Sequence, residues 1–216
     1  MIILNLKTYE KSISELDLYL NAAKEVTKSS GIKIFVAPPV TLLIKSVGKY
    51  ENILAQHVDD TELGAFTGSV PAKMIREAGA KGSLINHSEK RIGFEKLKTT
   101  IEKTKIEKLQ SFVCAESVEE ARKIASLEPT AIAIEPPELI GSGRSVTTAR
   151  AEIVIDGLNA VKAINPKIIF LCGAGVSNKS DAKKALELGA EGVLLASAFV
   201  NSKNPKEFLE ELADAF

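Results

Sequence analysis

The chain has 216 residues, of which 45% are hydrophobic and 26% are charged, a composition typical of a globular domain with a buried core. Its 28 basic and 28 acidic residues cancel, so no bulk field favours nucleic acid or an anionic membrane as a partner. No apolar run is long enough to span a membrane. Cys114 and Cys172 lie in apolar runs without metal-ligand neighbours, which predicts buried free thiols and a cytoplasmic location.

Short apolar runs alternate with longer amphipathic segments along the whole chain. The runs predict strands buried on both faces, over 2–4, 33–37, 53–56, 82–86, 111–114, 131–134, 167–172 and 192–195. The other segments predict helices, one from Ser14 that stops at Gly31, others over 42–50, 95–108, 147–164, 181–188 and 205–216, and two more beginning near Pro71 and Ser117.

This strict alternation indicates either an open, doubly wound parallel sheet or a closed barrel. Eight strand–helix units in one short chain, with no linker between them, favour the barrel. We therefore expect an α/β fold of the (β/α)8 TIM-barrel type, as a single compact domain over residues 1–216 with shortened helices.

Polar side chains follow several predicted strands at the point where each strand ends. Asn5 and Lys7 follow the first strand, Gln56 ends the third, His87 follows the fourth and Glu135 follows the sixth. The carboxyl ends of barrel strands form one rim, which is where barrel enzymes place their active sites. A carboxylate, an imidazole and an ammonium on this rim are suited to proton abstraction beside a carbonyl group.

The stretch after the sixth strand predicts a catalytic base under a closing loop. Glu135 is followed by Pro136 and Pro137, which exclude a helix, and by Gly141 and Gly143 at the tip of the loop. Taken alone, the stretch fits a surface acid beside an ordinary turn equally well. The other rim residues favour the catalytic interpretation.

The remaining candidates also have simpler alternatives. Lys7 could be a solvated charge, and His87 could be a hydrogen-bonded rim histidine; His57 is expected to be an ordinary loop residue. Gly173-Ala174-Gly175 precedes the eighth strand, where barrels often bind phosphate through backbone N–H groups. The triplet by itself is a weak signal.

Five motifs in register resemble the triosephosphate isomerase family in its short archaeal form. They are Asn5-Leu6-Lys7, Ala55-Gln56, Gly64-Ala65-Phe66-Thr67-Gly68, His87-Ser88-Glu89-Lys90-Arg91 and Ile134-Glu135-Pro136. The resemblance extends over nearly the whole chain. It implies interconversion of dihydroxyacetone phosphate and glyceraldehyde 3-phosphate through an enediolate, in glycolysis and gluconeogenesis, with no cofactor and no metal.

The resemblance also implies roles for individual residues. Glu135 is expected to move the proton between the two carbons. His87 is expected to be a neutral electrophile, its pKa lowered by the start of a helix. Lys7, beside Asn5, is expected to stabilise the enediolate and the phosphate, and Glu89 to orient the site.

The phosphate is expected to be held by backbone N–H groups. The residues that match the family in this role are Ile140 and Gly141 in the closing loop, Gly175 after the seventh strand, and Ala196 and Ser197 after the eighth. The loop, residues 136–146, is expected to close over the substrate and protect the intermediate from water.

The chain departs from the larger family members at several positions. Glu138 replaces an aromatic residue in the first hinge, Cys172 and Gly175 replace a Tyr and a Ser that latch the loop, and Ala196-Ser197 replaces a Gly-Gly pair. The segment around Phe66 resembles one that enters a neighbouring subunit's site, so we expect a homodimer or a homotetramer.

Two other functions remain as alternatives. One is a different phosphate-binding barrel enzyme, such as a sugar-phosphate epimerase or an indole-pathway barrel, which should carry other acids or metal ligands at the strand ends. The other is a catalytically silent barrel that only binds a phosphorylated metabolite or a partner protein. The lone histidine on the rim argues against a metal site and so against the first alternative, and the set of Lys7, His87 and Glu135 argues against the second.

Overall fold

A computed structural model describes residues 1–136 and 151–216. In this part of the chain, eight parallel strands form one sheet in the order β2-β1-β8-β7-β6-β5-β4-β3. The strands are β1 Ile2–Asn5, β2 Ile34–Ala37, β3 Leu54–Ala55, β4 Gly82–Ile85, β5 Gln110–Ala115, β6 Ala131–Ile134, β7 Ile169–Cys172 and β8 Gly192–Leu195. The sheet curves until its two edge strands meet at a single bridge, between Val36 and Ile53. The expected (β/α)8 TIM barrel is confirmed.

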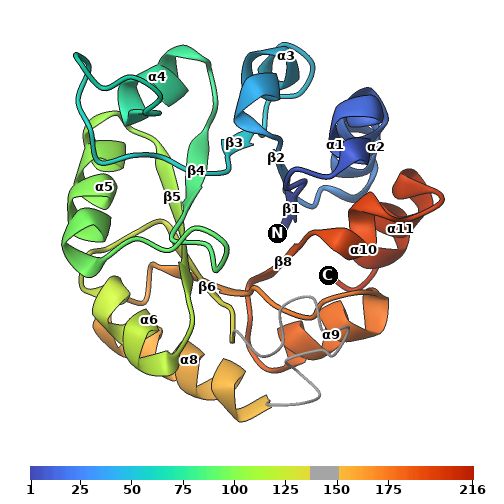
Figure 1. The fold of residues 1–216 in the computed structure, drawn as a ribbon. Coiled ribbons are helices and arrows are strands. Elements are labelled where there is room, and N and C mark those ends of the chain that lie inside the picture. Colours follow the sequence, from blue (N-terminus) through green and yellow to red (C-terminus); the bar gives the residue numbers. More distant parts are fainter. Residues whose placement is uncertain (137–150) are drawn as a thin grey trace.

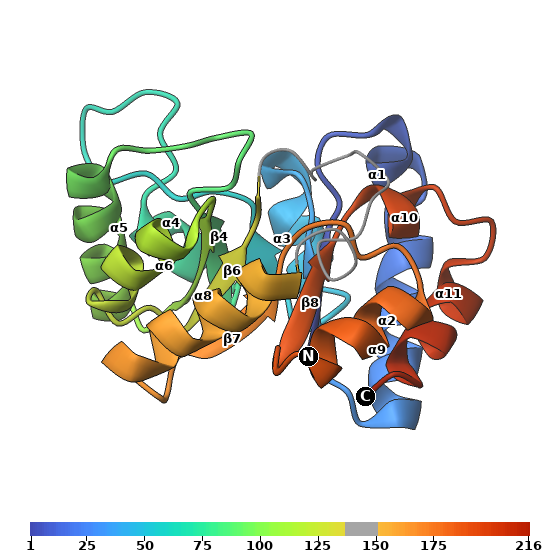
Figure 2. The ribbon, with the colours of Figure 1, turned by 90° about the horizontal axis from the view of Figure 1, so that it is seen from below.

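Helices surround this ring of strands in both views (Figures 1 and 2). The described helices are α1 Glu10–Ser14, α2 Leu16–Ser30, η1 Val40–Leu42, α3 Leu43–Val47, α4 Ala72–Glu77, α5 Phe94–Ile106, α6 Val118–Ala125, α8 Ala151–Ile164, α9 Lys179–Glu187, α10 Ser197–Val200 and α11 Pro205–Ala213. Several are short: α3, α4 and α6 have five, six and eight residues. Helix α2 from the first part of the chain packs against α11 from the last part. The N- and C-terminal segments therefore lie on the same side of the barrel (Figure 1).

The apolar side chains of each strand alternate between two cores. One core fills the barrel and takes one or two residues from every strand, among them Ile3, Phe35, Leu54, Leu84, Phe112, Ala133, Leu171 and Leu194. Their neighbours along the strands, such as Ile2 and Leu4, belong to a second core between the strands and the helices. Because both faces are covered, the strands read as continuous apolar runs.

Several element boundaries differ from the prediction. The helix predicted to open at Ser14 is α2, which begins at Leu16 and is capped at Gly31, and the short helix α1 before it was not predicted. The third strand keeps only Leu54–Ala55, because Gln56 leaves the ladder and its side chain hydrogen-bonds the carbonyls of Lys7 and Ala37. Helix α10 was not predicted. The predicted closing loop lies almost wholly outside the described residues, as does the first turn of the helix expected at 147–164.

Candidate active site

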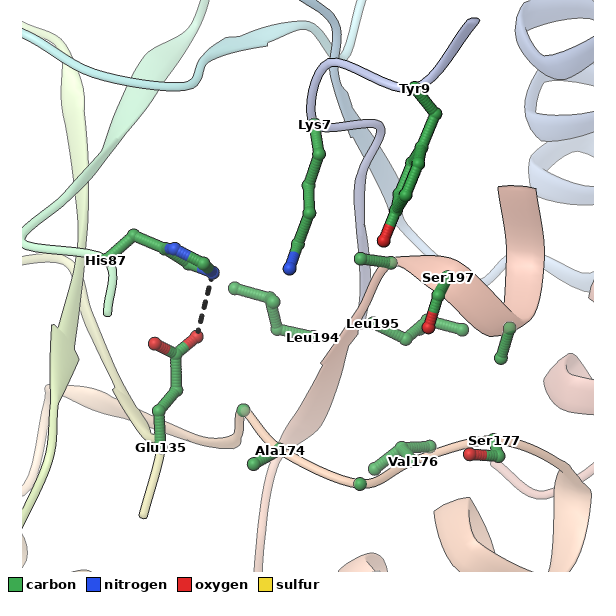
Figure 3. Close-up of a pocket in the computed structure, with 14 residues that line it drawn as sticks. Lys7, Tyr9, His87, Glu135, Ala174, Val176, Ser177, Leu194, Leu195 and Ser197 are labelled. Atoms are coloured by element: carbon green, nitrogen blue, oxygen red, sulfur yellow. Dashed lines mark ion pairs between the residues drawn. The ribbon is translucent and has the colours of Figure 1, made fainter. Parts of the chain in front are cut away.

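A cavity of about 190 Å³ opens at the carboxyl ends of the strands. Lys7, His87 and Glu135 point into it from three different strand ends (Figure 3). The loop 173–177 after β7 and the residues 194–198 at the end of β8 form its other wall. The three candidates that the sequence placed on one rim therefore line one pocket.

Glu135 follows β6 directly, and its position is set by the sheet. Its N–H donates to the Ala115 carbonyl at 2.7 Å, which continues the pairing of β6 with β5. The carboxylate is only 2% exposed, and burial raises its pKa to about 7, opposed by the Cys114 thiol and by the Ser88 N–H. That N–H lies 3.5 Å from Oε2. Oε1 is buried and has no hydrogen-bond donor among the described residues, so one acceptor of this carboxylate is unused.

His87 faces this free oxygen, with Nε2 at 3.7 Å from Oε1 of Glu135 (Figure 3). The Glu89 N–H donates to Nδ1 at 3.2 Å, so the ring proton of a neutral imidazole is on Nε2 and points into the pocket. Burial lowers the pKa of His87; the Glu89 carboxylate opposes this, and the charges of Lys7 and Arg91 reinforce it. The imidazole is therefore neutral near pH 7.

The expected physical cause of this neutrality was wrong. A turn follows His87, with the Lys90 N–H bonded to the His87 carbonyl, and α5 begins only at Phe94. His87 is therefore not at the start of a helix, and desolvation lowers its pKa in place of a helix dipole.

Lys7 is held in a left-handed backbone conformation, with φ of 47°, which is costly for a residue with a side chain. The Asn5 side chain accepts from its N–H at 3.0 Å, and the Gln56 amide donates to its carbonyl at 3.0 Å. Glu89 pairs with the ammonium at 2.6 Å. Asn5 and Glu89 thus support Lys7 from a hollow that adjoins the pocket.

The opposite wall presents backbone rather than charged side chains. Gly175 has a φ of 70°, and among the described residues the N–H groups of Gly175 and Ser197 donate no hydrogen bond. Ala196 and the Ser197 hydroxyl line the same wall. Ile140 and Gly141, the other two predicted phosphate ligands, lie outside the described residues.

Two further residues, one lining the pocket and one beneath it, were not predicted to belong to the site. Tyr9 lines the cavity, and its hydroxyl points toward the side of Ser197 (Figure 3); its place two residues after Lys7 was the available signal. Cys114 lies in the barrel interior, where burial raises the pKa of its thiol and the negative charge of Glu135 raises it further. The alternation of β5 could have placed it beneath the rim.

The described residues hold no cluster of His, Cys, Asp and Glu side chains that could bind a metal ion. No helix in the same ranges is both long and apolar enough to cross a membrane.

The chain matches the family model for triosephosphate isomerase over residues 1–214. It is 45% identical to the triosephosphate isomerase of Methanothermus fervidus over 215 residues, covering 98% of this chain and 96% of that protein. The enzyme of Methanocaldococcus jannaschii is 43% identical, with 98% of each chain covered. A crystal structure of the Bartonella henselae enzyme, 21% identical, shares the fold with a TM-score of 0.72 over 99% of this chain and 97% of that one. The chain belongs to the triosephosphate isomerase family.

Proposed function

We propose that the pocket at the carboxyl ends of the strands is the active site of this isomerase, which interconverts dihydroxyacetone phosphate and glyceraldehyde 3-phosphate. The observation that carries the proposal is the pairing of Glu135 with His87. One is a buried carboxyl group with a pKa of about 7, the other a neutral imidazole at 3.7 Å. The reaction needs a base at carbon and a proton donor at oxygen, and these two groups supply them.

Glu135 is the proposed base. A group whose pKa lies near the working pH accepts and returns a proton with little free-energy difference between its two states. Burial produces this match, and Oε1, which has no donor in the described part of the chain, faces Nε2 of His87 (Figure 3). The substrate carbon is proposed to bind beside this oxygen. The same carboxyl group can take the proton from one carbon and deliver it to the next.

His87 and Lys7 are proposed to stabilise the charge that develops on the substrate oxygens. The Nε2–H of a neutral imidazole donates a hydrogen bond to the carbonyl oxygen without protonating it completely. The Lys7 ammonium, drawn between His87 and Ser197 in Figure 3, attracts both the enediolate and the phosphate. Such fixed charges are most effective in a site from which water is largely excluded.

The substrate phosphate is proposed to bind on the opposite wall. The N–H groups of Gly175 and Ser197, which meet no acceptor within residues 1–136 and 151–216, support this, together with Ala196 beside them. Ile140 and Gly141 remain predicted ligands. No metal or cofactor takes part in the proposed reaction.

We also propose that the chain is one domain, acts in the cytoplasm, and assembles into a homodimer or a homotetramer. The single sheet from β1 to β8 supports one domain, and the two buried free cysteines fit a reducing compartment. Exposed apolar side chains on the segments after β2 and β3, such as Ile44 and Phe66, support a contact between subunits. Light scattering of the purified protein measures the subunit number.

One experiment tests the catalytic proposal. The parent protein and Glu135→Gln are assayed for triose-phosphate interconversion in both directions, without added metal. We expect turnover by the parent and a loss of roughly 10²- to 10⁴-fold in the variant, the usual contribution of a general base. An inactive parent that still binds inorganic phosphate would support the silent-barrel alternative, and an unimpaired variant would remove Glu135 as the base.

A further inference from the structure

Side chains along β4 point alternately into the barrel and toward the helices, and this alternation reverses just before His87. Leu84 faces the barrel interior, so a strand continued from it would send Asn86 into the barrel and His87 outward. Instead, Asn86 has a φ of 61°, a left-handed conformation that asparagine tolerates better than most residues. The side chain of Asn86 consequently turns outward to α6, and His87 faces the pocket.

The Asn86 side chain is completely buried and bonded on both of its polar atoms. Its amide nitrogen donates to the Cys114 carbonyl at 3.0 Å and to Oε1 of Glu120 at 3.2 Å. Its oxygen accepts from the Ile92 N–H at 3.0 Å. One side chain therefore joins the end of β4 to β5, to α6 and to the far end of the His87 turn.

Arg91 and Glu120 complete this arrangement. Arg91 donates to the Asn86 carbonyl at 3.2 Å and pairs with Oε2 of Glu120 at 2.5 Å. The same Oε2 accepts from the Glu116 N–H at 2.7 Å. The turn that carries His87 is thus tied at both ends to one carboxylate at the start of α6.

We infer that Asn86, Arg91 and Glu120 form a positioning bracket that fixes the imidazole of His87 against Glu135. They are positioning residues, since they contact the turn that carries His87 and do not line the described pocket. The inference rests on the proposed role of His87. It assigns the bracket a part in turnover beyond its contribution to folding, because the position of His87 depends on a backbone reversal that these contacts hold.

Asn86→Gly is the first test. Glycine adopts a positive φ without strain, so the variant keeps the backbone conformation accessible and removes the three side-chain hydrogen bonds. We expect kcat to fall roughly ten- to a hundredfold, as for a misplaced catalytic group, while KM stays nearly unchanged. Asn204→Gly is the matched control. Asn204 caps α11 through its side chain and does not line the pocket, so this variant should leave kcat at the parent value.

An exchange of partners tests the bracket without relying on one variant. Asn86→Asp places a carboxylate against Glu120 and should lower kcat. Adding Glu120→Gln reverses the sense of the hydrogen bond, because the new glutamine amide can donate to the new carboxylate at position 86. The geometry favours this exchange, since Oε1 of Glu120 faces Asn86 and Oε2 faces Arg91. We expect the double variant to recover part of the kcat lost in Asn86→Asp.

Two results would overturn the bracket: a kcat for Asn86→Gly equal to that of the parent, or a double variant no better than Asn86→Asp. Nitrogen NMR of the His87 ring supplies a readout that a change in stability alone does not alter. If the imidazole is displaced, the pH titration of its ring nitrogens should differ from that of the parent. His87→Gln is assayed in parallel. If that variant keeps full activity, the proposed role of His87 fails, and this outcome is separate from a failure of the bracket.

Discussion

The two walls of the pocket are built in different ways. The wall at β1, β4 and β6, which we call the proton-transfer wall, presents the side chains of Lys7, His87 and Glu135. The wall at β7 and β8, which we call the phosphate wall, presents mainly backbone at Gly175 and Ser197. In the proposed reaction, side-chain chemistry governs the first wall and chain conformation governs the second.

This difference shows which substitutions each wall tolerates. A proton donor or acceptor cannot be replaced by another residue type without changing the reaction, so the proton-transfer wall depends on residue identity. An N–H group is supplied by every residue except proline, so the phosphate wall depends on φ and ψ. In the proposed site, Ala196-Ser197 can therefore replace a Gly-Gly pair while the N–H groups remain.

After Glu135→Gln, the largest effect is expected for Lys7→Ala, which removes a charge from the proton-transfer wall. Turnover should fall roughly 10²- to 10³-fold, the usual cost of losing a group that stabilises developing charge. Lys45→Ala is the matched control, because Lys45 is a half-exposed surface lysine near Asp17. Steady-state assays of both variants check this, and equal effects would show that Lys7 has no special place on the rim.

The pH dependence of activity sharpens the assignment of Glu135. Because the base must be ionised and its pKa is about 7, kcat/KM should rise as the pH increases through this value. A base with an ordinary carboxyl pKa would place the rise below about pH 5. A profile without a transition between about pH 6 and 8 would contradict the buried-base assignment.

The same group should make the protein less stable at high pH. The folded pKa is raised above the unfolded value, so the folded state holds an extra proton between pH 4.5 and about 7. This stabilisation is complete below pH 4.5 and is lost as the pH rises through about 7. At about 1.4 kcal/mol per pKa unit, Glu135→Gln should raise the free energy of unfolding by up to about 3 kcal/mol at about pH 8. Denaturant unfolding at about pH 5 and about pH 8 measures the difference, and an equal effect at both values would argue against it.

The smallest effects are expected on the phosphate wall, where conformation should matter more than the side chain. Gly175→Ala forces a residue with a Cβ into a φ of 70°, at a cost of about 1–2 kcal/mol. We expect the loop to shift and KM to rise roughly tenfold, in keeping with that cost. Ser197→Ala keeps its N–H and should change KM by no more than about twofold, the size of one weak hydrogen bond. The opposite order would show that the hydroxyl, and not the backbone, binds phosphate.

Much of this architecture could be predicted from the sequence because it depends on local patterns. Continuous apolar runs predicted all eight strands, and the break after each run placed Lys7, His87 and Glu135 on one rim. Ser117 caps α6 as its spacing predicted, accepting from the Glu120 N–H. Boundaries were less accurate where side chains from distant elements intervene, as at Gln56 in the third strand.

The sequence by itself determined the barrel through its periodicity and the candidate catalytic residues through the residue types at strand ends. The family followed from the resemblance of five motifs. Only the tertiary structure decided the protonation states and the orientation of those residues. The raised pKa of Glu135 and the neutrality of His87 come from burial among segments far apart in the chain. The reversal at Asn86 likewise depends on contacts with Cys114 and Glu120. Desolvation and long-range hydrogen bonds arise only when the strands close into a barrel, so no local pattern in the sequence contains them.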